Sequence, residues 1–311
     1  MDRVRSNGSS YKIYDQIINN TIYNPDINMD TNFSRVKEAI LSVVLKVSML
    51  CTLLLFLGGK VFPQKLVVKG LICEYQTNPV GIDIMKPRFS WKLGSDQRNV
   101  LQTAYEIRVG ISADQIAKGK KLVYKTGKVQ SEQSVFVAFN GPELTSRTRY
   151  YWQVRVWDNK GNASSWSTPN YWEMGILKPE EWIAKWIKTD NPADSTDGAS
   201  PMFRTAFNLQ KKVRSARLYV TSHGIYEAYI NGQRVGTDYF TPGWTSYKTR
   251  LQYQAYDVTS LLNTGKNSIG VIVGNGWYRG ALGWGDNKNR WGKTSGLLFQ
   301  LEITFANDKK E

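Results

Sequence analysis

The sequence predicts an all-β protein made of two consecutive antiparallel β-sandwiches, which follow an N-terminal signal or anchor segment. Short segments that alternate apolar and polar residues begin at Leu66 and continue almost to the C-terminus, with turn residues between them. The chain has 311 residues, enough for two ordinary domains, and its content of 41% hydrophobic and 13% aromatic residues is typical of a globular protein. One long apolar run, Ile40 to Leu57, precedes the alternating part.

This apolar run resembles a secretory signal. Arg35 and Lys37 precede it as a basic region, and Gly58-Gly59 follows it as a zone of small residues where cleavage is tolerated. We therefore interpret residues 29–64 as a signal peptide or anchor. The resulting expectation is export, either to the periplasm or to the outside of the cell.

Two alternatives to a cleaved signal stay open. Residues 40–57 are long enough for an uncleaved membrane anchor. A lipoprotein linked through Cys51 is the other alternative, although the preceding "VSML" fits such a signal poorly. The polar residues 1–28 show no apolar periodicity, so we expect them to be disordered, or the true start to be Met29.

Residues 66–178 form the first predicted sandwich. In "RYYWQVRVWD" one parity holds Tyr150, Trp152, Val154 and Val156, and the other holds Gln153 and Arg155, which places one face on a core and one in water. Leu144 followed by Tyr150 is similar to the tyrosine corner of fibronectin type III domains. The turn "DNKGN" leads to a last strand near Tyr171 to Met174. No catalytic grouping occurs here, which favours a spacer or packing role.

Residues 183–311 form the second predicted sandwich, which we expect to be jelly-roll-like. Asn231-Gly232 lies between two strand-like flanks and predicts a tight hairpin. Trp182 and Trp186, in the segment between the sandwiches, are expected to wedge between the two domains. A turn signal at Asn307-Asp308 follows the strand Leu297–Phe305 with no later strand to pair with it. We therefore expect this sandwich to be truncated at its C-terminus and to leave that strand with an unpaired edge.

Charge and cysteine content exclude several classes of protein. The chain holds 41 Lys and Arg against 26 Asp and Glu, a net charge of +15, but the basic residues are scattered. This favours a solvated basic surface over a nucleic-acid site. With only Cys51 and Cys73, neither a disulfide framework nor a cysteine metal cage is possible, and Cys73 is expected to be a small buried apolar residue.

The glycine-rich stretch "GNGWYRGALGWGDNKNRWG", residues 274–292, does not fit a phosphate site. Its first glycines are spaced G-x-G-x-x-x-G, one residue longer than a dinucleotide-binding motif, and no βαβ pattern surrounds them. Gly292-Lys293-Thr294 ends like a P-loop, but six residues separate it from the preceding Gly285 where a P-loop has four. His223 is the only histidine, so we interpret it as a packing or hydrogen-bonding residue.

Sugar recognition remains as the functional hypothesis for this stretch. Aromatic faces stack on the C–H faces of a pyranose, while amide, carboxylate and guanidinium groups bind neighbouring hydroxyls. The alternative is that the tryptophans pack against a neighbouring domain. The predicted substrate-binding residues are Asp238, Trp244, Asn275, Trp277, Tyr278, Trp284, Asn287, Arg290 and Trp291.

Several long motifs resemble a known family. "INGQRVGTDYFTPGWTSYKTRLQYQAYDVTSLL" and "GNGWYRGALG" are similar to the N-terminal sandwich domain of bacterial α-L-rhamnosidases, glycoside hydrolase family 78. "NPVGIDIMKPRFSWKL", "LQTAYEIRV" and "LTSRTRYYWQVRVWDNKGNASSWS" resemble the fibronectin-like module that precedes that domain in many members. The resemblance covers residues 66–311, in the expected order, and leaves out the first 60 residues.

The resemblance implies an exported hydrolase that removes terminal α-L-rhamnose from plant glycans or glycosides with inversion. In that family the general acid and base belong to a large (α/α)6 barrel that lies downstream of these domains. The chain ends before such a barrel, so no catalytic residue is assigned. The missing catalytic domain is the expected partner, and the chain alone is predicted to be inactive.

Two other functions stay open at this point. Some related sandwiches bind rhamnose with calcium without catalysis, so a stand-alone rhamnose-binding module is the main alternative. Hard oxygen ligands for calcium are available, but no EF-hand-like spacing is present. A basic nucleic-acid-binding protein is the weaker third hypothesis. The candidate calcium ligands are Asp238, Asp286, Asn287 and Asn289.

Overall fold

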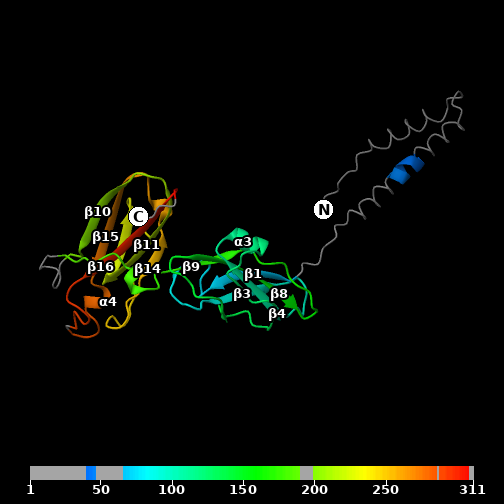
Figure 1. Ribbon diagram of the computed structural model, residues 1–311, viewed down its shortest axis with the longest axis horizontal. Helices are drawn as coiled ribbons and strands as arrows, with labels where there is room; N and C mark the ends of the chain where they lie inside the picture. The colour runs from blue at the N-terminus through cyan, green and yellow to red at the C-terminus, as the bar shows by residue number, and fades with distance from the viewer. Residues whose placement is uncertain (1–39, 47–65, 190–198, 286, 308–311) are drawn as a thin grey trace, which may run out of the picture. The chain divides into compact units, whose positions relative to one another are not determined.

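The computed structural model describes residues 40–46, 66–189, 199–285 and 287–307 (Figure 1). The chain divides into two compact units, residues 1–62 and 63–311. In the first unit the described residues 40–46 form an exposed helical segment. No helix among the described residues is long and apolar enough to span a membrane. The expectations for residues 1–28, for the rest of the signal or anchor segment and for Asp286 lie outside the described residues.

The first sandwich has two sheets. In one, β3 lies between β1 and β7; in the other, the order is β2-β9-β8-β4-β5, with β6 also paired to β4. All these pairs are antiparallel except β2–β9, which is parallel. The elements are β1 (Val67–Cys73), β2 (Val80–Ile82), β3 (Arg88–Gly94), β4 (Gln102–Gly110), α3 (Ala113–Lys118), β5 (Tyr124–Lys125), β6 (Val129–Gln130), β7 (Val137–Ala138), β8 (Arg149–Asp158) and β9 (Asn170–Met174).

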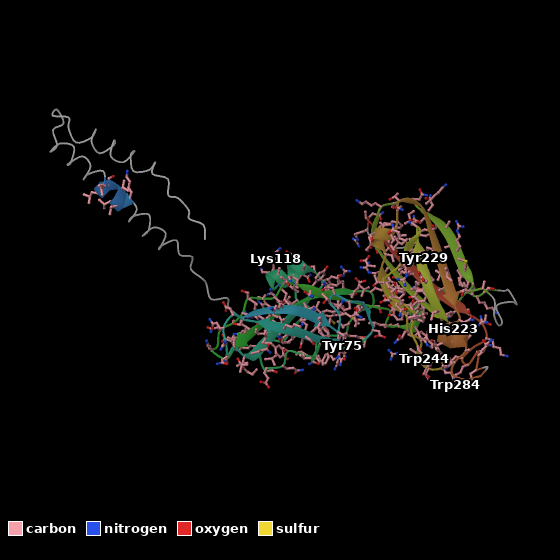
Figure 2. The ribbon with its side chains drawn as sticks, turned by 180° about the vertical axis from the view of Figure 1, so that it is seen from behind. Tyr75, Lys118, His223, Tyr229, Trp244 and Trp284 are labelled. Atoms are coloured by element: carbon pink, nitrogen blue, oxygen red, sulfur yellow. The ribbon has the colours of Figure 1, made fainter. Side chains whose placement is uncertain are left out.

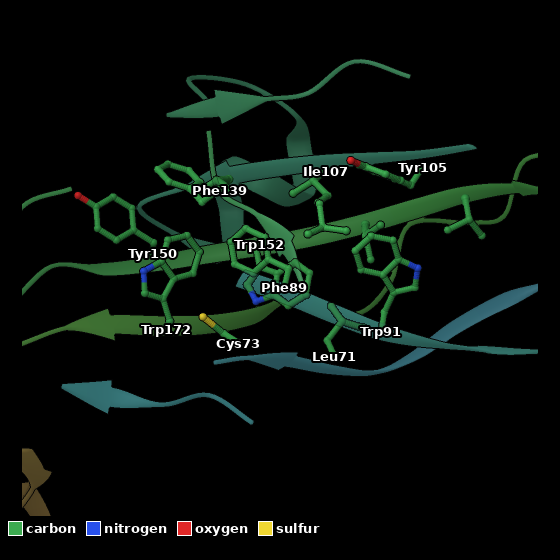
Figure 3. Close-up of a cluster of buried hydrophobic side chains, with 14 of the residues drawn as sticks. Leu71, Cys73, Phe89, Trp91, Tyr105, Ile107, Phe139, Tyr150, Trp152 and Trp172 are labelled. Atoms are coloured by element: carbon green, nitrogen blue, oxygen red, sulfur yellow. The ribbon is translucent and has the colours of Figure 1, made fainter. Parts of the chain in front are cut away.

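Large aromatic side chains fill the core of this sandwich (Figure 3). Phe89 of β3 stacks on Trp152 of β8 with 4.4 Å between ring centroids, and Trp172 of β9 stacks on Tyr150 at 5.1 Å. Trp152 and Trp172 are completely buried. Cys73 is also buried, as predicted, and burial raises the pKa of its thiol. The alternation read from the sequence of β8 therefore identified the core face correctly.

The predicted tyrosine corner is present. The hydroxyl oxygen of Tyr150 accepts a hydrogen bond of 3.0 Å from the backbone N–H of Thr145, while the neighbouring Leu144 is buried. A bond from a strand tyrosine to the backbone a few residues upstream is the defining feature of this corner. It fixes the loop that enters β8.

The face of β8 that points away from the core carries a ladder of cations and indoles, which we call the cation–indole ladder. Arg155 lies 4.9 Å from the ring centroid of Trp157 and 4.8 Å from that of Trp166. Lys128 contacts the Trp157 ring at 4.8 Å, and Arg108 contacts the Trp166 ring at 4.0 Å. Such contacts are favourable because each ring face carries partial negative charge.

The second sandwich also has two sheets, with strand orders β10-β15-β12-β13 and β14-β11-β16. Its core is mainly aliphatic, with members such as Leu218, Ile230 and Val271. The two sandwiches confirm the predicted all-β class. The elements from the linking segment onward are η1 (Pro179–Glu181), β10 (Met202–Leu209), β11 (Val213–His223), β12 (Ile225–Ile230), β13 (Gln233–Arg234), β14 (Gln254–Asp257), η3 (Thr259–Leu261), β15 (Gly265–Gly274), α4 (Gly276–Arg279) and β16 (Gly296–Phe305).

Strand β16 is the edge strand of its sheet. It pairs with β11 along its whole length, from Val213 opposite Phe305 to His223 opposite Gly296. On its other side, Leu297 forms a two-bond bridge with Ile187, with both N···O distances at 2.9 Å. Beyond that bridge the outer edge of β16 is unpaired among the described residues, so the expected unpaired edge is not contradicted. Its main partner lies far upstream in the chain, where no local turn signal could indicate it.

The Asn231-Gly232 hairpin is confirmed. β12 pairs with β13 across it, and the two turn residues have φ values of 50° and 79°. Both values lie in the left-handed region that this tight turn requires. The side chain of Asn231 also donates to the backbone carbonyl of Leu261 and to Asn267, so the turn is joined to the loop before β15.

Candidate functional site

The glycine-rich stretch forms the connection between β15 and β16. After Gly274 the chain makes the single-turn helix α4 and then a loop that returns to Gly296 (Figure 1). Gly276 has φ +51°, and a Cβ there would lie 2.6 Å from the Ile225 side chain. A glycine is thus required both for the backbone conformation and for the close approach to β12.

The loop brings most of the predicted aromatic residues together. Trp244 and Trp277 are stacked, with centroids 5.9 Å apart and planes 12° from parallel. Trp291 meets Trp244 edge-on at 6.1 Å. Tyr247 links the group by edge contacts of 5.3 Å with both Trp291 and Tyr278. We call these five residues the ring cluster.

Sequence reasoning missed two aromatic residues at this site. Tyr247 is a member of the ring cluster, and Phe240 contacts Trp277 edge-on at 5.9 Å. The available signal was the density of aromatic residues in "YFTPGWTSY", of which only Trp244 was selected. Burial raises the pKa of both Tyr247 and Tyr278, as expected for phenols enclosed by other rings.

Exposure separates the aromatic residues of this region into two groups. Trp277, Tyr278 and Trp291 are half-buried by their neighbours, whereas Trp244 is 57%, Phe240 66% and Trp284 96% exposed. Figure 2 shows Trp244 and Trp284 at one end of the second sandwich, away from Tyr229. Only the exposed group offers a free ring face to a ligand or to another domain.

The predicted polar residues do not converge on the ring cluster. Asp238 lines a different hollow, where its carboxylate accepts a 3.1 Å hydrogen bond from the Tyr256 hydroxyl. Asn287 donates to the backbone carbonyl of Trp284 at 3.0 Å, which stabilises the loop itself. Asn275 precedes α4 without capping it through its side chain, and the exposed Arg290 lies 5.5 Å from the Trp291 ring centroid.

Two of the candidate calcium ligands are engaged by other groups, and Asp286 lies outside the described residues. Asp238 is bound to Tyr256, and the amide of Asn287 is used within its own loop. Among the described residues no group of three His, Cys, Asp or Glu side chains could hold a metal ion. The residues present therefore do not form an evident calcium site, and no step of a mechanism is assigned to this ion.

His223 lies at the end of β11 between two parallel rings. Trp186 stacks on one face at 4.2 Å and Tyr278 on the other at 4.6 Å. Burial lowers the pKa of His223. The packing role expected for this histidine agrees with the geometry. Trp186 is stacked on the second sandwich and is 43% exposed, so it does not form the expected wedge between the two domains.

Another hollow, of about 630 Å³, contains Glu173 and Glu302, which are the two carboxylates to be considered for glycosidase chemistry. Glu173 is bound by Arg217 and Arg149, each at 2.9 Å. Glu302 is bound by Arg147 at 2.7 Å. A catalytic carboxyl group must face the glycosidic bond, whereas both carboxylates here are engaged by guanidinium groups. These groups act as ion pairs that join the two sandwiches.

Comparison with known families gives two matches along the chain. Residues 68–178 match the Rha78A-like N-terminal immunoglobulin domain, and residues 211–311 match the α-L-rhamnosidase N-terminal domain. The chain carries N-terminal domains of the α-L-rhamnosidase family.

Individual α-L-rhamnosidases show how much of such a protein this chain represents. One from Formosa agariphila is 38% identical over 248 residues, which cover 77% of this chain and 26% of the relative. The structure of the Streptomyces avermitilis enzyme complexed with L-rhamnose has a TM-score of 0.74 at 26% identity, covering 79% of this chain and 40% of that one. The Dictyoglomus thermophilum enzyme has a TM-score of 0.71 at 37% identity, with coverage of 78% and 28%. The chain thus spans about a quarter of the length of the Formosa relative.

Proposed function

We propose that this chain is the N-terminal accessory segment of an exported α-L-rhamnosidase that acts on terminal α-L-rhamnose of plant glycans or glycosides. The observation that carries the proposal is the match to relatives named α-L-rhamnosidase over 77% of the chain but only 26% of the relative. Residues outside this chain perform the hydrolysis. The two sandwiches position and stabilise the part that does so.

The arrangement of carboxylates supports an accessory role. Inverting hydrolysis requires one carboxylic acid and one carboxylate on opposite sides of the sugar. Glu173 and Glu302 line the hollow of about 630 Å³, Glu181 shares Arg147 with Glu302, and each of the three is bound by an arginine. A hydrogen bond from Ser146 lowers the pKa of Glu181, and the Arg147 charge acts in the same direction. These glutamates are suited to holding the two sandwiches together.

An activity assay tests the proposal. The 311-residue chain is expected to release no aryl alcohol from an aryl α-L-rhamnoside, whereas the product of the reading frame continued past Glu311 is expected to release it. The control is the longer product in which the two carboxyl residues that act as general acid and general base are replaced by the corresponding amides. Rhamnose release by the 311-residue chain would overturn the accessory role.

Export is a separate part of the proposal and has its own test. Residues 29–64 fused to a reporter that is active only outside the cytoplasm are expected to give activity. Replacing the apolar residues 47–57 with polar ones is expected to abolish it, because the apolar region is what the export machinery inserts. Equal reporter activity for the two fusions would contradict export by this segment.

A stand-alone rhamnose-binding module is the second candidate, favoured by the exposed rings of Trp244 and Trp284. Titration of the chain with L-rhamnose, with and without calcium, measures this directly. Binding that is lost in both Trp244→Ala and Trp284→Ala would support the module. Binding that is unchanged in both variants would exclude these rings as the sugar site.

A further inference from the structure

A smaller hollow of about 400 Å³ lies where β16 begins, and its lining includes His223 and one member of the ring cluster, Tyr278, but neither Trp244 nor Trp284. The linking segment before β10 forms one side, through Trp186 and Lys188. The loop before β16 forms the other, through Lys293 and Thr294, and Gly296 lies at its base. Neither the family matches nor the sequence motifs assign a role to it.

The backbone fixes the geometry of this hollow. The two hydrogen bonds between Ile187 and Leu297 hold the linking segment against β16, so Trp186 and Lys188 are placed on the same side of that pairing. Gly296 lets the Trp186 ring approach closely, since a Cβ there would lie 3.2 Å from Trp186 Cε3. The ring is supported by His223 and remains 43% exposed. One aromatic surface therefore faces the hollow from a defined position.

The charge of the hollow is positive. Lys188 and Lys293 are both exposed, and neither forms an ion pair with an acid among the described residues. Among the described residues, none that lines the hollow carries a carboxylate. Beneath it, the buried Arg279 donates a 3.0 Å hydrogen bond to Ser295 Oγ and so holds the loop before β16 in place. An anion entering the hollow would be attracted by the ammonium groups of Lys188 and Lys293.

We propose that this hollow binds a sugar unit that carries an acidic group, either a carboxylate or a sulfate. The pyranose ring packs on Trp186, the acidic group lies between the ammonium groups of Lys188 and Lys293, and the Thr294 hydroxyl binds a ring hydroxyl. Carboxylate and sulfate share the negative oxygen atoms that ammonium groups bind. The inference goes beyond the proposed function and does not depend on hydrolysis.

The observations favour an acidic saccharide over the other ligands. A neutral sugar would use the indole but leave both ammonium groups without a partner. A nucleic acid requires positive charge that continues along a face, whereas the basic residues of this chain are scattered. The hollow offers an aromatic surface and a pair of cations within a space suited to one or two sugar units.

Calorimetric titration of the full 311-residue chain tests this inference. The probes are trigalacturonate for the carboxylate, a sulfated galactose for the sulfate, and galactose as the neutral sugar of the same ring type. We expect binding of at least one acidic probe and none of galactose. The double variant Lys188→Gln/Lys293→Gln is expected to weaken binding at least about tenfold, because it removes two charged hydrogen-bond donors. Trp186→Leu is expected to weaken it as well, and Trp186→Phe to retain part of it.

A matched control separates a site from the general effect of a charge of +15. Lys211→Gln/Lys212→Gln removes the same two charges just before the opposite end of β11, about 36 Å away at about 3.3 Å per residue over 11 residues. This variant is expected to bind like the wild type. An equal loss in both double variants, equal binding of galactose, or no binding of either acidic probe at millimolar concentration would overturn the inference. The inference would also be overturned if duplex DNA displaced the acidic probe and did so equally well from the Trp186→Leu variant. Because the readout is binding, its failure leaves the accessory role untouched.

Discussion

The two sandwiches use aromatic residues in different ways. In the first, Phe89, Trp152 and Trp172 form the core and are fully buried. In the second, the core is mainly aliphatic, and the tryptophans lie in end loops, where Trp244 is 57% and Trp284 96% exposed. The comparison shows that aromatic residues serve two purposes within one chain, the packing of a core and the supply of exposed rings in loops. Burial distinguishes rings that hold the fold from rings available for contact.

Trp152→Ala gives the largest expected effect. The substitution leaves a cavity at the centre of the first sandwich, so its free energy of unfolding should fall by about 3–5 kcal/mol. Urea unfolding, followed by the near-ultraviolet circular dichroism of the aromatic core, measures the loss. The transition of the second sandwich should be less affected. A loss below about 1 kcal/mol would mean that the core tolerates collapse around this position.

Trp277→Ala is expected to have an intermediate effect. This ring is half-buried, stacked on Trp244 and in contact with Phe240, and such ring pairs contribute about 0.5–1.5 kcal/mol each beyond the burial of area. We expect the second sandwich to lose about 1–2 kcal/mol. Trp277→Phe, which keeps a ring, is the control and should lose less. Equal losses would show that ring stacking is not the stabilising contact.

Tyr150→Phe should have a smaller effect, in the first sandwich. It keeps the stacking on Trp172 and removes only the hydroxyl that accepts from the Thr145 N–H. A lost hydrogen bond of this kind costs about 1 kcal/mol. Chemical denaturation measures the difference, and hydrogen exchange at Thr145 reports on the same bond. No change in that exchange rate would argue against a structural role for the corner.

Trp284→Ala is expected to change stability least. The side chain is 96% exposed, so its removal should alter the free energy of unfolding by no more than about 0.5 kcal/mol. A thermal melt beside Trp152→Ala gives the comparison directly. A large loss here would place Trp284 in a contact that its exposure does not reveal and would break the distinction between the two groups of rings.

Local signals explain what the sequence could predict. The alternation around Trp152 identified a core face, and Asn231-Gly232 identified a hairpin, because side-chain parity and positive φ are decided within a few residues. The pairing of strands that lie far apart in the chain carries no such local signal. The pairing of β16 with β11 joins segments far apart in the chain, and its register depends on packing across the whole sandwich.

The candidate site was predictable only in part for a related reason. Tryptophan and glycine content identified the loop, but the position of each side chain depends on contacts with other loops. Tyr247 joins the ring cluster from a separate segment, whereas Asp238, only nine positions earlier, faces a different hollow. The hollow at Gly296 depends on the pairing of Ile187 with Leu297, which sequence alone did not indicate.

The cation–indole ladder bears on how well the first sandwich resists proteases. A protease specific for basic residues needs an extended strand with a free arginine or lysine side chain. Arg155 lies in the middle of β8, paired to both a neighbouring strand and two indole rings. Cleavage at Arg155 would require the strand to leave the sheet and the guanidinium to leave both rings at once. Proteolysis at this position therefore depends on global unfolding of the sandwich. At Arg155, such a protease therefore acts on the unfolded chain and not on the folded sandwich.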